Sequence, residues 1–230
     1  MSNVNEELIN KYKNDKVIIK TYYTDKQGVN IDGIVNPLKI DNRHLVSPTD
    51  DQSRYPACAG YSACTLIESI YFKQTGKLVQ LDSKQVYAKA KELDGQRDME
   101  GTYLETALEA ALKLCDFDFL KNAKIRTFGN MKNLDTIEAT KFLIHKYDFI
   151  QVGFYIDEAW YRCNNDNYVL ESGGVALGGH AVYACGYDSQ GVFIGNQWGK
   201  SWGTKGFAIM PWDLYLKELM YGAYITGITY

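Results

Sequence analysis

Five cysteines and three histidines carry most of the reactive chemistry in this sequence. Two of the cysteines, Cys58 and Cys64, lie in the short segment ACAGYSACTLIES. Such a pair fits half of a metal site, a redox pair, a reactive thiol beside a structural one, or two core thiols. The histidines show no ligand spacing with each other or with a cysteine pair, and there is no CxxC, so a structural zinc site is disfavoured.

A cysteine nucleophile needs a thiolate, a base that relays its proton, and donors for the oxyanion that forms when a carbonyl is attacked. Cys58 lies at the predicted start of a long helix, where unpaired N–H groups and the helix dipole favour the thiolate. Cys64 lies nearly two turns further along, where the dipole helps little. We therefore interpret Cys58 as the reactive candidate and Cys64 as a packed core thiol.

Three polar side chains elsewhere can complete this chemistry. His180, in GGHAVYACGYD, is the candidate base, and Asn196, in GNQWGKSWGTKGF, has an amide that can orient an imidazole while Trp198 keeps water away. Gln52, upstream of Cys58, can donate to an oxyanion beside the Cys58 backbone N–H. Each alone also has an ordinary explanation: a structural histidine, a glycine-rich turn with core aromatic residues, and a surface glutamine.

Taken together, the order Gln52, Cys58, His180, Asn196 resembles the papain-like cysteine peptidase family. The most specific motif is NxWGxxWGxxGF, followed by HAVxxxGYD, and the resemblance runs from about residue 40 to the C-terminus. It implies that Cys58 is the nucleophile, His180 the general base and later acid, and Asn196 the residue that orients His180. Gln52 and the Cys58 N–H then form the oxyanion hole.

The resemblance also implies where substrate binds. EGTYLETAL resembles the family's glycine-bearing segment along the cleft, so Gly101 is expected to bind substrate backbone. The residues expected near the pocket for the side chain that precedes the scissile bond are Gly178, Gly179 and Ala181. Trp198 is also expected to bind substrate. No metal and no organic cofactor is implied.

These residues must be positioned by an α+β fold, with a helical half followed by an antiparallel, β-barrel-like half. Periodicity and turn residues predict helices over 58–75, 81–95, 100–117 and 133–148, with caps at Asp82 or Ser83 and near Thr102, where Glu105 completes a capping box. The predicted strands are 149–157, 179–188, 191–198, 206–210 and 221–229.

The expected organisation is an N-terminal extension over residues 1–40 and a papain-like peptidase domain over residues 41–230. The extension carries a short helix over 4–13 and a β-hairpin formed by strands near 17–23 and 31–35. We expect this extension to remain part of the fold. Within the domain, the helical half covers about 58–147 and the β half about 148–230, with the cleft between them.

Composition disfavours nucleic-acid binding and a membrane-spanning helix. A net charge of −3 disfavours nucleic-acid binding, and no apolar run is long enough to span a membrane. No signal segment is seen. An odd number of cysteines favours reduced thiols, so the expected location is the cytoplasm or another reducing compartment. Delivery of the protein into another cell is also compatible with this expectation. Tyr55 and Ala59 stand where the family usually has a cysteine and a tryptophan, and Gly179 stands where many relatives carry Asp or Asn, so the family's usual disulfide cannot form there.

The expected function is therefore a cysteine peptidase that cleaves polypeptides through a thioester acyl-enzyme. One alternative is that the same triad performs another acyl transfer, as an isopeptidase, deamidase or transpeptidase. The other is a catalytically silent peptide-binding module on the same scaffold, which is disfavoured because all four functional residues are present. The sequence leaves the substrate preference and the oligomeric state open.

Overall fold

The computed structural model describes residues 36–47, 51–130 and 132–229. The helix over 4–13 and the hairpin predicted in the N-terminal extension lie outside these residues. The first described strand is β1 (Ile40–Asp41), which is followed by the 3-10 helix η2 (Arg43–Leu45).

Two helices have the caps that the sequence predicts. Helix α3 (Cys58–Thr75) ends at Gly76, which adopts the left-handed conformation with φ 67°. Helix α4 (Ser83–Asp94) begins at Asp82, whose carboxylate accepts hydrogen bonds from two backbone N–H groups of the first turn. Gly60 of α3 packs so close to α4 that an added Cβ would lie 2.9 Å from the Cβ of Tyr87, so a small residue is required there.

Helix α5 (Leu104–Leu114) starts differently from the prediction. The predicted cap near Thr102 is wrong, because the Thr102 hydroxyl donates instead to the carboxylate of Asp94, 2.7 Å away. The first free N–H of the helix, that of Leu104, donates to the hydroxyl of Tyr221 at 2.8 Å. A side chain from the far end of the chain therefore replaces the local cap.

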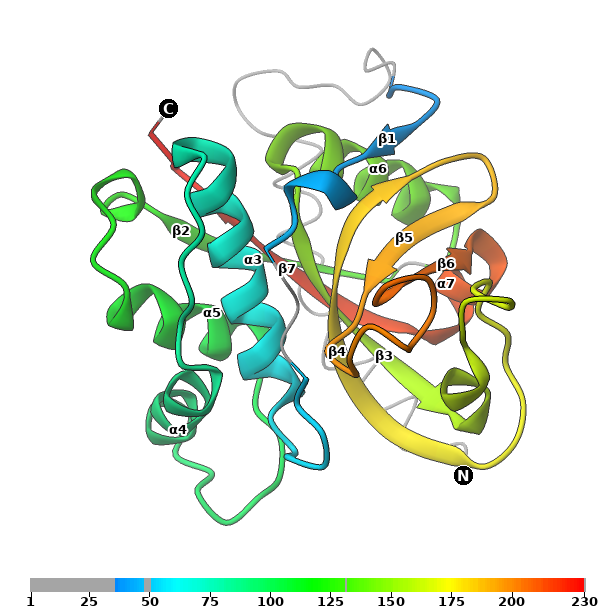
Figure 1. Cartoon of the computed structure of the whole chain (residues 1–230), viewed down its shortest axis with the longest axis horizontal. Helices are drawn as coiled ribbons and strands as arrows, with labels where there is room; N and C mark the ends of the chain where they lie inside the picture. Colours follow the sequence, from blue (N-terminus) through cyan, green and yellow to red (C-terminus); the bar gives the residue numbers. More distant parts are fainter. Residues whose placement is uncertain (1–35, 48–50, 131, 230) are drawn as a thin grey trace.

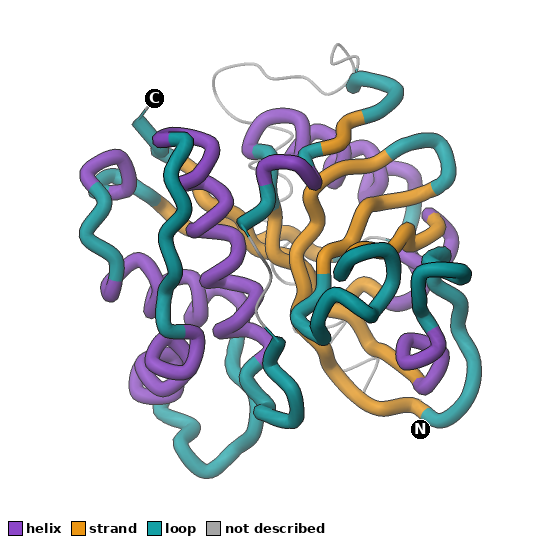
Figure 2. The backbone as a smooth tube through the Cα atoms, viewed as in Figure 1, coloured by secondary structure: helices purple, strands orange, loops and turns teal. Residues whose placement is uncertain are grey.

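One antiparallel sheet forms most of the other half of the molecule (Figures 1 and 2). Its strands follow the order β2-β7-β3-β4-β5-β6, and β1 pairs with β4. The strand β2 and the short helix α7 were not predicted from the sequence. The bounds are β2 (Lys124–Gly129), β3 (Ile150–Asp157), β4 (Ala176–Tyr187), β5 (Gly191–Gly195), β6 (Phe207–Pro211), α7 (Trp212–Glu218) and β7 (Leu219–Thr226).

The sheet separates two hydrophobic cores. Helices α3, α4 and α5 pack on one face, and side chains that alternate along β4, such as Ala181 and Tyr183, enter that core. Helix α6 (Leu134–Tyr147) packs on the opposite face with α7, so it belongs with the sheet and not with the helical half in which the sequence placed it. The helices that pack as a group are therefore α3, α4 and α5 (Figure 1).

Candidate active site

Cys58 is the first residue of α3, and its side chain is partly exposed at the boundary between the helices and the sheet. Because no side chain caps this helix end, the N–H groups of the first turn stay directed toward the boundary. Burial raises the pKa of the Cys58 thiol, while backbone hydrogen bonds from Ala181, Ala59 and Cys58 itself act to lower it. Position at a helix start alone therefore does not ionise this thiol, and a base must take its proton.

His180 is buried on β4, and its Nε2 atom lies 2.8 Å from Oδ1 of Asn196. The same Oδ1 accepts a hydrogen bond from the backbone N–H of Gln197 at 2.8 Å. Since a backbone N–H only donates, the amide atom facing it must be the oxygen, and that oxygen can only accept from His180. Nε2 therefore carries the hydrogen, and Nδ1 holds the lone pair of a base.

Two tryptophan rings surround this imidazole. Trp198 stacks on His180 with ring centroids 4.7 Å apart, and the edge of Trp160 meets it at 6.0 Å. Their burial of His180 lowers its pKa to about 4, against the hydrogen bond to Asn196, which raises it. At neutral pH the imidazole is therefore uncharged and ready to accept a proton.

Gln52 lies beside Cys58 on the loop that leads into α3. Its backbone N–H donates to the carbonyl of Gln197 at 2.9 Å, which ties this loop to the sheet beside Asn196. Its side-chain Nε2 donates to the carbonyl of Tyr55 at 3.0 Å, and this bond fixes the orientation of the amide. Because Nε2 carries two hydrogens, the second remains for an acceptor in the cavity.

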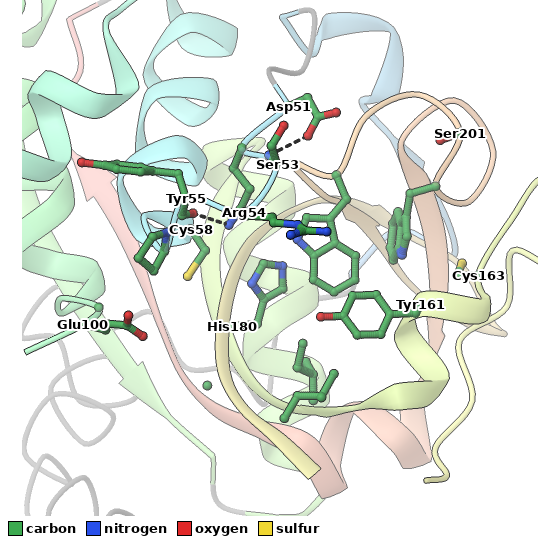
Figure 3. Close-up of a pocket in the computed structure, with 18 of the residues that line it drawn as sticks. Asp51, Ser53, Arg54, Tyr55, Cys58, Glu100, Tyr161, Cys163, His180 and Ser201 are labelled. Carbon is green, nitrogen blue, oxygen red and sulfur yellow. Dashed lines mark hydrogen bonds between the residues drawn. The ribbon is translucent and has the colours of Figure 1, made fainter. Parts of the chain in front are cut away.

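Two cavities meet at Cys58 and His180. The larger cavity, of about 910 Å³, extends past Gln52 and Trp198 to Tyr161 (Figure 3). The smaller cavity, of about 310 Å³, extends the other way and ends against Met220 and Tyr221. The described residues hold no group of three or more His, Cys, Asp or Glu side chains that could bind a metal, and no described helix combines the length and apolar character needed to cross a membrane.

The residues predicted to bind substrate lie around these cavities, with one exception. Gly101 and Gly179 border both cavities, Ala181 borders the smaller one and Trp198 the larger one. Gly178 borders neither cavity, although it is next to Gly179 at the start of β4. The binding roles of all five residues stay predictions.

The backbone of Gly101 already has partners inside the protein. Its N–H donates to the hydroxyl of Tyr87 at 3.0 Å, and its carbonyl accepts from Nζ of Lys91 at 2.9 Å. The same Nζ pairs with the nearly inaccessible carboxylate of Asp94, 3.2 Å away. This buried ion pair holds the cleft-lining loop in place, and it leaves only the second lone pair of the Gly101 carbonyl for a substrate.

Comparison with known proteins shows what this chain is similar to. No protein-family model matches the sequence. Cathepsin K from Mus musculus is 27% identical over 76% of this chain, which spans 59% of cathepsin K. Xylellain, a cysteine protease from Xylella fastidiosa, superposes with a TM-score of 0.62 at 19% identity, covering 85% of this chain and 88% of xylellain. The chain is a divergent relative of the papain-like cysteine peptidases.

A second solved papain-like structure agrees with this fold. The Carica candamarcensis cysteine protease CMS1MS2, solved in complex with E-64, superposes with a TM-score of 0.61 at 17% identity. The alignment covers 83% of this chain and 98% of that protease. The α+β fold class expected from the sequence is thus confirmed.

Two residues of this papain-like chain that depart from the family pattern have structural roles here. The carbonyl of Tyr55 accepts the side-chain hydrogen bond of Gln52, so this position supports the loop without a disulfide. Ala59 is buried, and its carbonyl accepts a hydrogen bond from Nε2 of Gln151 on β3 at 2.8 Å. Cys64, as expected, is buried, and it faces the hydrophobic core that α3 shares with the sheet.

Sequence reasoning missed a buried polar network below Cys58. Nε2 of Gln151 also donates to the Ser62 hydroxyl at 2.6 Å, and that hydroxyl lies 2.9 Å from the carbonyl of Cys58. The side-chain amide of Gln197, turned to satisfy both neighbours, accepts from the Ser62 N–H and donates to the carbonyl of Ala181. The network thus connects helix α3, which begins at Cys58, to strand β4, which carries His180, and to the segment after β5 that carries Asn196. A glutamine within the apolar segment FIQVGF was the one available signal.

Proposed function

We propose that this chain is a cysteine peptidase that cleaves polypeptides with Cys58, His180 and Asn196. The observation that carries the proposal is the fixed hydrogen bond between His180 Nε2 and Asn196 Oδ1, which leaves Nδ1 as the proton acceptor in the cavity that Cys58 borders. Figure 3 draws the sulfur of Cys58 and the ring of His180 side by side.

The reaction follows from these positions. The Cys58 sulfur attacks the substrate carbonyl carbon as the thiol proton passes to Nδ1 of His180, and the carbonyl becomes a tetrahedral oxyanion. The Cys58 N–H and the second hydrogen of Gln52 Nε2 stabilise that negative charge. When the C–N bond breaks, Nδ1 returns the proton to the leaving amine, and a thioester remains on Cys58.

Water then completes the cycle. Nδ1 of His180 takes a proton from the water as its oxygen attacks the thioester carbon. The C–S bond then breaks to release the acid, and Nδ1 returns the proton to the Cys58 sulfur. The thiol must stay reduced throughout. The five cysteines, none of which is in a disulfide, therefore support the expectation of a reducing compartment.

A peptide-library digest tests the proposal. We expect the wild-type protein to cut internal peptide bonds, and the Cys58→Ala variant to release no products above background. Mass spectrometry of the products identifies new carboxyl termini and distinguishes hydrolysis from transfer to another amine. The proposal is contradicted if the wild-type protein yields only deamidated or ligated peptides, or if Cys58→Ala digests as fast as wild type.

A further inference from the structure

Trp160 is the centre of the aromatic cluster that surrounds the His180 imidazole. It is completely buried and borders neither cavity. Its ring meets His180 edge-on, with the planes inclined by 89°, and it also contacts Trp198 and Trp202, with ring centroids 6.5 and 6.1 Å away. Because these rings are closely packed, a movement of Trp160 changes the wall against which the imidazole rests.

Two hydrogen bonds fix Trp160, which belongs to the 3-10 helix η4 (Glu158–Arg162). Its carbonyl accepts a hydrogen bond from the indole of Trp202 at 2.8 Å, and its own indole donates to the carboxyl of Glu218 at 3.3 Å. An indole nitrogen can only donate, so the position of the ring depends on an acceptor at this point. Glu218 supplies that acceptor from the last residue of α7.

The sheet holds Glu218 in place. The next residue, Leu219, begins β7 and pairs with Phe154 on β3, which pairs in turn with His180 on β4. The side-chain amide of Asn130 donates to the carbonyl of Leu219 at 2.9 Å and secures the junction between helix and strand. The acceptor for the Trp160 indole therefore follows from the same row of the sheet that carries the candidate base.

The Glu218 carboxyl is buried, and no basic side chain in the described part of the chain forms an ion pair with it. Burial raises its pKa to about 7, and the negative charge of Asp157 at the end of β3 acts in the same direction. The hydrogen bond from Trp160 and the charge of Lys217 act to lower it. Lys217 extends away to the hydroxyl of Ser172 at 2.6 Å, so the carboxyl has no close compensating charge.

Other charged groups near α7 are directed elsewhere. Glu158 of η4 accepts a backbone hydrogen bond from the loop over residues 171–175, and the guanidinium of Arg162 lies beside the same loop. On α6, Lys141 faces the ring of Trp212 at the opposite end of α7. Strands β5 and β6 contribute apolar side chains to the core that α7 covers. The charges that act on the buried carboxyl are therefore those of Asp157 and Lys217.

We propose that Glu218 is a positioning residue for the proposed peptidase reaction: its neutral carboxyl holds Trp160 against His180, and its ionisation releases that contact. A carboxylate needs hydration, which burial beside Asp157 denies it, so ionisation draws water between α7 and η4 and shifts the indole. The imidazole then loses part of its fixed orientation, and proton transfer to and from Cys58 slows. The inference rests on the proposed function, because it concerns the rate of that reaction.

The test measures kcat between about pH 5 and pH 9 with a peptide that the wild-type protein cleaves. We expect kcat of the wild-type protein to fall by about tenfold across an alkaline limb whose midpoint lies near pH 7. Glu218→Gln keeps an acceptor for the indole and cannot ionise, so its profile should lack this limb. Glu158→Gln is the matched control: it removes a carboxyl of η4 that binds the 171–175 loop, and it should keep the wild-type limb. Far-UV circular dichroism at each pH confirms that the chain stays folded.

A second readout does not depend on cleavage. In the Cys58→Ala protein, the indole N–H resonance of Trp160, assigned with Trp160→Phe, should shift with a midpoint near pH 7, and adding Glu218→Gln should abolish the shift. An alkaline limb that persists in Glu218→Gln would overturn the inference, as would an indole resonance that does not titrate. If no peptide is cleaved in a Cys58-dependent manner, both the proposed function and this inference fail, whereas cleavage with a flat profile near pH 7 overturns the inference alone.

Discussion

The side chain of Gln151, at the centre of the sheet, reaches the first turn of helix α3, which begins at Cys58, and donates to the carbonyl of Ala59 at 2.8 Å. Gln151 is completely buried, and its second donor bond, to Ser62, supports the residue whose hydroxyl meets the Cys58 carbonyl. A strand of the sheet thereby fixes the position of Cys58 relative to His180, although neither Gln151 nor Ser62 touches the cavities.

Replacing Gln151 by leucine should therefore lower kcat strongly and lower the free energy of unfolding only slightly. Leucine fills a similar volume, and it also removes the buried amide oxygen, which has no partner among the described residues. We expect kcat to fall by about ten- to hundredfold through misplacement of the nucleophile, with KM little changed and unfolding free energy lowered by about 1 kcal/mol. Steady-state kinetics and urea unfolding measure both effects, and a loss of stability with unchanged kcat would contradict this role.

The acid limb of the pH–rate profile should lie at an unusually low pH. His180 must be uncharged to accept the thiol proton, and burial lowers its pKa to about 4. We therefore expect kcat/KM to fall as the pH drops through about 4, rather than through about 6.5, the ordinary value for histidine.

Asn196→Asp provides the matched test of this assignment. The variant keeps the shape and the acceptor oxygen, but its negative charge stabilises the imidazolium and so raises the pKa of His180. The acid limb should move to higher pH. A limb that stays in place would show that His180 is not the titrating base.

Glu218 should make the fold less stable as the pH rises. Burial raises the pKa of this carboxyl to about 7, although the hydrogen bond from Trp160 acts to lower it. Because the folded-state pKa lies above the ordinary 4.5, the stabilising contribution of the protonated carboxyl is fully present below pH 4.5 and is lost as the pH rises through about 7.

Glu218→Gln keeps a hydrogen-bond acceptor for Trp160 and cannot ionise. Between pH 4.5 and pH 8, wild type should lose about 1 to 3 kcal/mol of unfolding free energy relative to this variant. Denaturant titrations at the two pH values measure the difference. Parallel pH dependence in the two proteins would refute the contribution of Glu218.

Local signals predicted the Gly76 cap of helix α3 and the Asp82 cap of helix α4. The helix begins at Cys58 after the polar segment and ends at Gly76, because glycine adopts the left-handed conformation without strain. Likewise, Asp82 caps α4 through its own carboxylate. Cys58, at the start of α3, and His180, on β4, border the same cavity, and Asn196 directly after β5 contacts His180.

Tertiary contacts decided the features that the sequence could not predict. Thr102 is a good local cap, but the nearly inaccessible carboxylate of Asp94 accepts the hydrogen bond of its hydroxyl, and Tyr221 caps α5 from more than one hundred residues away. Strand β2 exists because β7 pairs with it, and its six residues carry too weak an alternation to be recognised alone. The network around Gln151 depends on the same long-range pairing of strands and helix.

Covalent labelling of the intact protein with a thiol-directed epoxide, followed by peptide mapping, tests most directly whether Cys58 is the nucleophile. We expect one label per chain, on Cys58, and its loss in His180→Ala, because the thiol then lacks the base that removes its proton. Cys64 and Cys185 are buried and should stay unlabelled. Labels spread over all five cysteines, or none on Cys58, would contradict the assignment of Cys58 as the nucleophile.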